Sequence, residues 1–147
     1  MKIYGFTGTS KGMTQKQRAT FRYLLNELKV TELHHGDCIG ADSQAHVLCR
    51  ELNVHITVHP PIADIKRVFC QARPNVLILD PKPYLVRNRD IVAAGINGLI
   101  ATPKDFVQPS NLRGQGTWTT IDYARKSRRS IHIIFPDGIF VMENEVK

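Results

Sequence analysis

Short apolar runs alternate with amphipathic helical patterns along most of this chain. The apolar runs fall at residues 3–7, 32–35, 54–59, 98–101 and 131–135, and apolar side chains recur at helical spacing over 14–28, 42–52, 87–94 and 117–126. Parallel strands need long crossover connections, and helices usually supply them. The alternation therefore predicts an α/β fold built on a mostly parallel sheet.

One Rossmann-like domain is expected over residues 1–147. A chain of this length that is 42% hydrophobic suffices for a single core. With the five strands numbered in chain order, we expect the sheet order 3-2-1-4-5, with helices on both faces. After the Pro-Asp-Gly turn at 136–138, residues 139–143 are predicted to add an antiparallel edge strand.

Residues 62–86 carry weaker signals. Residues 65–72 fit a short helix, and 76–79 are apolar enough for a strand but lie between Pro74 and Pro81. Elsewhere the element ends are clearer, since Thr14 and Gln17 have capping-box spacing at the start of the first helix. Because the signals at 62–86 are weak, the predicted five-strand order does not include this segment in the sheet.

The chain is basic, with 20 Lys and Arg against 13 Asp and Glu and a formal net charge of +7. This bias favours anionic partners, and a basic surface that serves only solubility is the alternative. No apolar run reaches 18 residues, and the N-terminus lacks a signal peptide's hydrophobic segment. Three cysteines without C-x-x-C spacing suit a reducing compartment. We expect a cytoplasmic protein with no membrane partner.

His34, His35 and Cys38 resemble a metal site only superficially. Adjacent strand residues point to opposite faces of a sheet, and the pattern offers no complete set of four ligands. His46 falls on the predicted helix 42–52, where a buried, hydrogen-bonded histidine is at least as good an explanation as a ligand contact. We predict no metal and no cofactor.

Three glycine-rich loops follow predicted strands. Gly114-Gln115-Gly116-Thr117 runs directly into a helical pattern, where close backbone approach and unpaired N–H groups would bind an anion. A Thr-capped helix after a flexible loop is the simpler alternative. The loops at 8–12 and 35–42 follow the first and second strands, so the predicted topology brings all three to one edge of the sheet.

Two motifs carry a family resemblance. Gly36 to Asp42 followed by Ala45-His46 resembles the Gly-x-x-x-Gly-x-Asp-x-x-Ala-His signature of DNA-processing protein A, and Arg87 to Val92 resembles its Arg-Asn-Arg-x-Ile helix start. The loops at 8–10 and 113–117 are similar to those of the wider SLOG superfamily, which includes the Lonely guy phosphoribohydrolases. The resemblance covers residues 3–135 and implies a Rossmann-like domain that binds nucleotides, nucleotide-derived ligands or single-stranded DNA.

The chain departs from the Lonely guy pattern at one position. There the Gly-x-Gly-Thr turn is followed after two residues by a glutamate that supports cleavage of the base from the sugar phosphate, and here that position is Thr120. A threonine does not stabilise the positive charge that develops on the sugar. Four carboxylates outside the motif are the alternatives: Asp37, Asp42, Asp105 and Asp122.

Individual residues near the loops have competing explanations. Arg87 and Arg89 lie at a predicted helix N-terminus, which disfavours cations, so a bound phosphate is the better explanation for them. Asp42 is more simply a helix cap than a catalytic group. Trp118 would stack on a nucleobase or pack on a neighbouring subunit. Trp118 and the resemblance together lead us to expect a homodimer or larger homo-oligomer.

The leading hypothesis is binding or sensing of a nucleotide or nucleotide-derived anionic ligand. An N-glycosidic or nucleotide hydrolase and a single-stranded nucleic-acid binding protein are the alternatives, and no catalytic residue is assigned. The predicted ligand-binding residues are Gly8, Thr9, Ser10, Gly36, Asp37, Gly40, Asp42, Arg87, Asn88, Arg89, Arg113, Gly114, Gln115, Gly116, Thr117 and Trp118.

Overall fold

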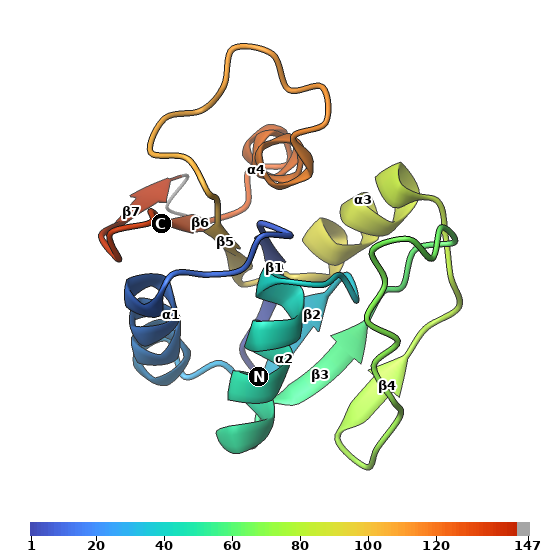
Figure 1. Cartoon of the computed structure of the whole chain (residues 1–147). Helices are drawn as coiled ribbons and strands as arrows, with labels where there is room; N and C mark the ends of the chain where they lie inside the picture. The colour runs from blue at the N-terminus through green and yellow to red at the C-terminus, as the bar shows by residue number, and fades with distance from the viewer. Residues whose placement is uncertain (144–147) are drawn as a thin grey trace.

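A single seven-stranded sheet organises the computed structural model, which describes residues 1–143 (Figure 1). The strand order is β4-β3-β2-β1-β5-β6-β7, parallel except for the antiparallel β6–β7 pair. In chain order the elements are β1 (Ile3–Gly8), α1 (Gln15–Glu27), β2 (Glu32–His35), α2 (Ala41–Glu51), β3 (His55–Val58), β4 (Val76–Ile78), α3 (Tyr84–Ala94), β5 (Gly98–Thr102), α4 (Gly116–Lys126), β6 (Ile131–Ile134) and β7 (Phe140–Glu143).

This architecture confirms the predicted α/β class and the antiparallel strand at the C-terminal edge. The predicted order 3-2-1-4-5 corresponds to β3-β2-β1-β5-β6. The structure adds β4 outside β3, so the apolar residues at 76–78 do form a strand. Among residues 1–143, no helix has the length and apolar character needed to cross a bilayer.

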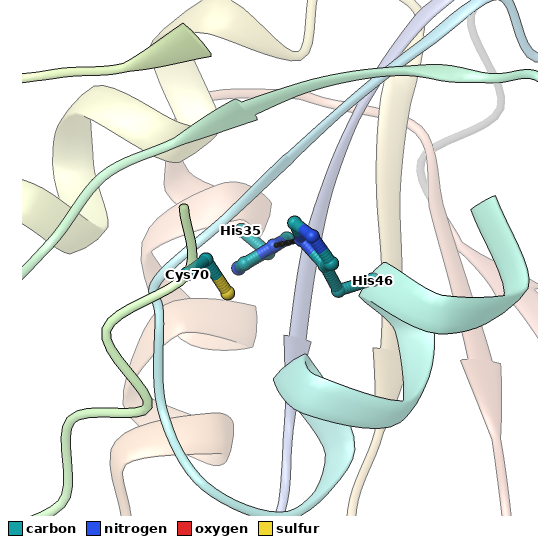
Figure 2. A group of neighbouring side chains, drawn as sticks. All are labelled: His35, His46 and Cys70. Atoms are coloured by element: carbon teal, nitrogen blue, oxygen red, sulfur yellow. Dashed lines mark hydrogen bonds between the residues drawn. The ribbon is translucent and has the colours of Figure 1, made fainter. Parts of the chain in front are cut away.

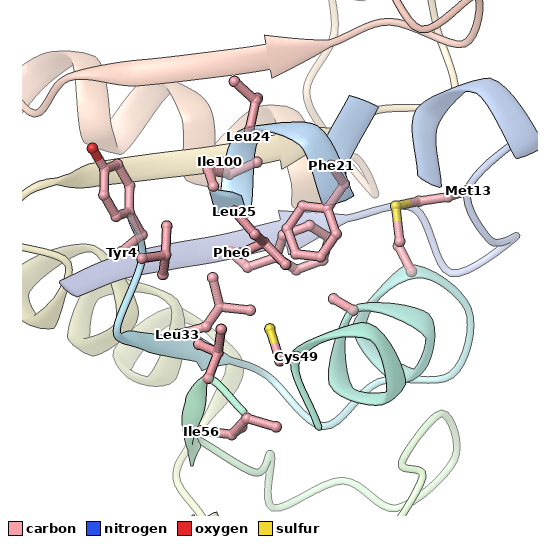
Figure 3. Close-up of a cluster of buried hydrophobic side chains, with 14 of the residues drawn as sticks. Tyr4, Phe6, Met13, Phe21, Leu24, Leu25, Leu33, Cys49, Ile56 and Ile100 are labelled. Atoms are coloured by element: carbon pink, nitrogen blue, oxygen red, sulfur yellow. The ribbon is translucent and has the colours of Figure 1, made fainter. Parts of the chain in front are cut away.

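Helices cover both faces of the sheet (Figure 1). Helices α1 and α2 pack on one face, where Phe6 of β1 meets Phe21 of α1 with ring centroids 5.1 Å apart (Figure 3). Helices α3 and α4 pack on the other face, around the buried Val92, Trp118 and Ile121. The central strands β1, β5 and β6 are largely buried on both sides, which is why they read as continuous apolar runs in the sequence.

The predicted capping box of the first helix is present. The Thr14 hydroxyl accepts from the Gln17 backbone nitrogen at 3.0 Å, and the Gln17 side chain accepts from the Thr14 nitrogen at 3.0 Å. Gln17 is itself buried, and its amide also donates to the carbonyls of Pro103 and Ile134. The cap therefore joins α1 to the ends of β5 and β6 as well as starting the helix.

The predicted short helix at residues 65–72 is wrong, because this segment is not helical in the structure. Its backbone instead bonds to the loop after β2: Val68 donates to the Asp37 carbonyl, and the Lys66 carbonyl accepts from Ile39, each at 2.9 Å. Cys70 N–H donates to the Asp37 carboxylate at 2.9 Å. Tertiary partners thus satisfy the groups that a helix would have paired internally.

Candidate functional site

A cleft of about 540 Å³ opens at the carboxyl ends of β1 and β5. The chain places β2 to β4 on one side of β1 and β5 to β7 on the other, so this is the point where the strand order reverses. In open α/β sheets ligands bind at such a point. The loops after β1, β2 and β5 and the first turns of α3 and α4 all contribute to the cleft wall.

Most of the residues predicted to bind a ligand line this cleft. They are Gly8, Thr9, Ser10, Gly36, Asp42, Arg87, Asn88, Gly114, Gln115, Gly116, Thr117 and Trp118. Asp37, Gly40, Arg89 and Arg113 do not line it. The predicted convergence of the three glycine loops is therefore present, and the four remaining residues have other surroundings.

Contacts or backbone conformation within the chain explain why three of the loop positions must be glycine. A Cβ on Gly8 would overlap the Thr102 hydroxyl, and one on Gly36 would overlap the Arg87 guanidinium. Gly40 has a φ of +86°, and its Cβ would overlap the Ser10 carbonyl. Tight packing and backbone conformation thus explain these glycines without any ligand.

Gly114 and Gly116 differ from those three. A Cβ built on either meets no atom within 4 Å, so both positions face open space at the cleft. Gly114 has a φ of +71°, which accounts for its glycine, but Gly116 does not have a positive φ. Nothing in the described chain requires a glycine at Gly116.

The N-terminus of α4 presents unpaired donors to the cleft. No residue in the described range accepts from the backbone N–H groups of Gly116, Thr117 or Trp118. The N-cap is Gln115, whose side chain makes no capping bond, so the alternative of a Thr-capped helix is wrong. Free N–H groups at the positive end of a helix dipole form an anion-binding arrangement.

Asp42 is a buried carboxylate at the cleft wall, 5% exposed. Its Oδ2 accepts from the backbone nitrogens of Gly36 at 3.1 Å and Cys38 at 3.2 Å. The predicted role as cap of its own helix is wrong, since the side chain bonds to the preceding loop and α2 has no side-chain cap. Burial raises the pKa of Asp42 to about 6, although the Arg87 charge opposes this rise.

Arg87 is buried beside this loop, in the second turn of α3. Its guanidinium donates to the carbonyls of Gly36 and of His59, the latter at 3.2 Å. The helix begins at Tyr84 rather than near Arg87, so the argument that a bound phosphate must compensate Arg87 at the helix N-terminus loses its basis. Arg87 holds the floor of the cleft through backbone carbonyls.

Arg89 lies on the exposed side of α3, 5.4 Å from the centroid of the Tyr123 ring. The cations that line the cleft with Arg87 are instead Lys66 and Lys104. Sequence reasoning missed both. Lys104 lies two residues after the end of β5, a position that the topology alone would have placed at the cleft, whereas Lys66 belongs to the non-helical 60–75 segment.

Trp118 is 3% exposed and packs in the core between α4 and the sheet. Its indole nitrogen donates to the Asp105 carboxylate at 3.2 Å. The burial of Trp118 within its own chain removes the local reason to expect it to pack on a neighbouring subunit. Self-association stays a prediction that light scattering would test.

The structure separates the four alternative carboxylates. Asp37 is fully buried and paired with Arg67 at 2.7 Å, and Asp122 pairs with Lys126 at 3.0 Å along α4. Neither lines the cleft, whereas Asp42 and Asp105 do. Asp105 is already engaged with Trp118 and with Lys104. Asp42 is thus the cleft carboxylate that lacks an ion-pair partner within residues 1–143.

Two buried histidines, His35 of β2 and His46 of α2, lie beside Cys70 of the 60–75 segment (Figure 2). Nitrogens of His35 and His46 and the sulfur of Cys70 lie within 4.8 Å of one another. His35 Nδ1 accepts from the Asp37 backbone nitrogen at 3.0 Å, so its Nε2 carries the proton and donates to His46 Nδ1 at 2.9 Å. Burial raises the pKa of the Cys70 thiol to about 12. These contacts describe a hydrogen-bonded cluster in which the His35 ring is neutral and the Cys70 thiol keeps its proton, and His46 is one of its two buried histidines.

The sequence matches no protein-family model and no curated protein.

Proposed function

We propose that this chain binds a nucleotide or nucleotide-derived anionic ligand in the cleft at the ends of β1 and β5. The phosphate lies against the N–H groups at the start of α4, and the SLOG-like loops described from the sequence form the surrounding walls. The resemblance to that superfamily is part of the proposal.

The observation that carries the proposal is Gly116. Its missing side chain leaves open space at the cleft, and neither packing nor a positive φ requires a glycine there. A ligand that approaches the backbone closely supplies the missing reason. The unpaired N–H groups of Gly116 and Thr117 favour a negatively charged ligand.

The surrounding charges support an anion with a larger neutral part. Lys66 and Lys104 contribute cations to the cleft wall. At the start of α3, Tyr84 and Leu85 contribute ring and aliphatic surface to the cleft wall, and Leu85 is 61% exposed. A phosphate at one end and a flat apolar group at the other match the two kinds of surface in one cleft.

Thermal unfolding with a nucleotide panel tests this function. AMP, GMP, CMP and UMP, each at millimolar concentration, should include one that raises Tm by several degrees, since a ligand at about 100 times its Kd stabilises the folded state by roughly 2.7 kcal/mol. Inorganic phosphate at the same concentration should raise Tm less. If none of the nucleotides shifts Tm and oligo(dT) binds with a steep salt dependence, single-stranded nucleic acid is the ligand instead.

A further inference from the structure

The side chain of Asp42 has one oxygen that the protein uses and one that it does not. Oδ2 accepts from Gly36 and Cys38, as described above. Oδ1 has no hydrogen-bond partner in the described chain. It is also not among the fully buried polar atoms that lack a partner, so part of its surface is accessible. Because Asp42 lines the cleft and its side chain is otherwise enclosed, this free acceptor is open to whatever the cleft holds.

A buried acceptor of this kind selects the chemistry opposite it. A carboxylate oxygen accepts hydrogen bonds and repels phosphate, and leaving it unpaired on ligand binding would be costly. No Lys or Arg of the described residues lies within 4 Å to neutralise it. The part of the ligand that faces Asp42 therefore carries O–H or N–H donors rather than negative charge.

The position of Asp42 narrows the donor further. The preceding residue, Ala41, donates its backbone N–H to the Thr9 carbonyl at 3.0 Å, so the start of α2 is tied to the turn after β1. Thr9 and Ser10 of that turn line the same cleft as the α4 turn. In a nucleotide the donors nearest the phosphate are the sugar hydroxyls, because the sugar joins the phosphate to the base.

We propose that Asp42 Oδ1 accepts from the vicinal hydroxyls of a ribose, so that the cleft selects ribonucleotides over deoxyribonucleotides. This inference rests on the proposed nucleotide-binding function and adds the sugar that the ligand carries. It also assigns Asp42 a binding role that is separate from the structural bonds made by Oδ2.

Asp42→Asn tests the role of Oδ1 with little disturbance of the loop. The amide oxygen can take the place of Oδ2 and keep the bonds from Gly36 and Cys38, which leaves the NH₂ group at the position of Oδ1. The free acceptor thus becomes a donor. Asp122→Asn is the matched control, because Asp122 lies on α4 outside the cleft and pairs with Lys126.

The probes are the tightest-binding of AMP, GMP, CMP and UMP and its 2′-deoxy and 3′-deoxy analogues, measured by titration calorimetry. With the unmodified protein, removing at least one hydroxyl should weaken binding about tenfold or more, as expected for a hydrogen bond to a charged group. In Asp42→Asn the ribonucleotide and its analogues should differ by less than about twofold, whereas Asp122→Asn should keep the full preference.

Three results would overturn the inference in different ways. Equal binding of all three sugars by the unmodified protein rejects ribose selection and leaves nucleotide binding intact. Failure of every nucleotide to bind rejects the proposed function and this inference together. A preference for ribose that survives in folded Asp42→Asn, as judged by thermal unfolding, places the sugar contact on another residue.

Discussion

Asp42 Oδ2 lies 3.1 Å from the backbone nitrogen of Gly36, and this bond holds a buried carboxylate whose pKa is raised to about 6 by burial. An acid that binds its proton more tightly in the folded state destabilises that state when it is ionised. The cost is present in full above pH 6, and it fades as the pH falls towards 3.8, where the unfolded-state group also becomes protonated.

Asp42→Asn should therefore stabilise the protein at pH 7.5, by up to roughly 3 kcal/mol for a shift of about two pH units. At pH 4 most of this gain should be gone. Urea unfolding at both pH values measures the difference. An Asn variant that is less stable than the unmodified protein at pH 7.5 would show that the ionised carboxylate is needed to hold the loop.

His59 gives the opposite pH dependence. Burial, and then the neighbouring His34 ring, lower its pKa to about 4, so the folded state keeps it neutral while the unfolded chain takes up a proton below pH 6.5. The free energy of unfolding should fall as the pH drops from 7 to 4.

His59→Gln, whose amide can replace the 2.7 Å bond to His34, should lose about 2 kcal/mol less of its free energy of unfolding between pH 7 and pH 5 than the unmodified protein does. The control is His55→Gln on the exposed start of β3. Equal losses in both variants would contradict this assignment.

Removing a cation from the cleft wall should weaken nucleotide binding, whereas removing one from outside the cleft should not. Lys104→Ala removes a charge from the cleft wall and should weaken binding roughly two- to fivefold, as expected for a largely solvated ion pair. Arg89→Ala should leave affinity unchanged, because Arg89 lies outside the cleft. A larger loss in Arg89→Ala than in Lys104→Ala would place the anion elsewhere.

In the resemblance that we propose, Thr120 falls where the Lonely guy enzymes carry a glutamate, and its hydroxyl donates to the Gly116 carbonyl at 2.9 Å. It is buried at the cleft wall and supplies no charge. We expect no release of free base from AMP above the rate of a protein-free blank, measured by chromatography. Thr120→Glu, if folded, should produce detectable release. Rapid base release by the unmodified protein would show that another group, with Asp42 the first candidate, performs the chemistry.

The sequence was most informative for the strands that helices cover on both faces of the sheet. Strands covered on both faces must be apolar throughout, so β1, β5 and β6 were recognisable from their residues alone, and the topology then placed the loops at 8–10 and 114–117 together. The 60–75 segment was not predictable, because Asp37 supplies its hydrogen-bond partners from 30 or more residues away.

The interpretations of Arg89 and Trp118 failed because the sequence did not reveal which way each side chain points from its helix. Placing the start of α3 near Arg87 treated Arg87 and Arg89 alike as residues of the helix N-terminus, whereas in the structure Arg87 is buried and Arg89 is exposed. Residues two apart on a helix point in different directions. Trp118 was misjudged because its place in the first turn of α4 did not reveal that its own side chain packs in the core.

Binding of the tightest nucleotide to Gly116→Val tests whether the phosphate lies against the N–H groups at the start of α4. The valine fits without strain, because no atom lies within 4 Å of the Cβ position and φ is not positive, but it projects into the space proposed for the phosphate. Gln15→Val is the matched control, since it adds the same side chain at the exposed first position of α1. By titration calorimetry, we expect no detectable binding to folded Gly116→Val and unchanged affinity in Gln15→Val. Full affinity in a Gly116→Val protein that unfolds at the same temperature as the unmodified chain would contradict this placement of the phosphate.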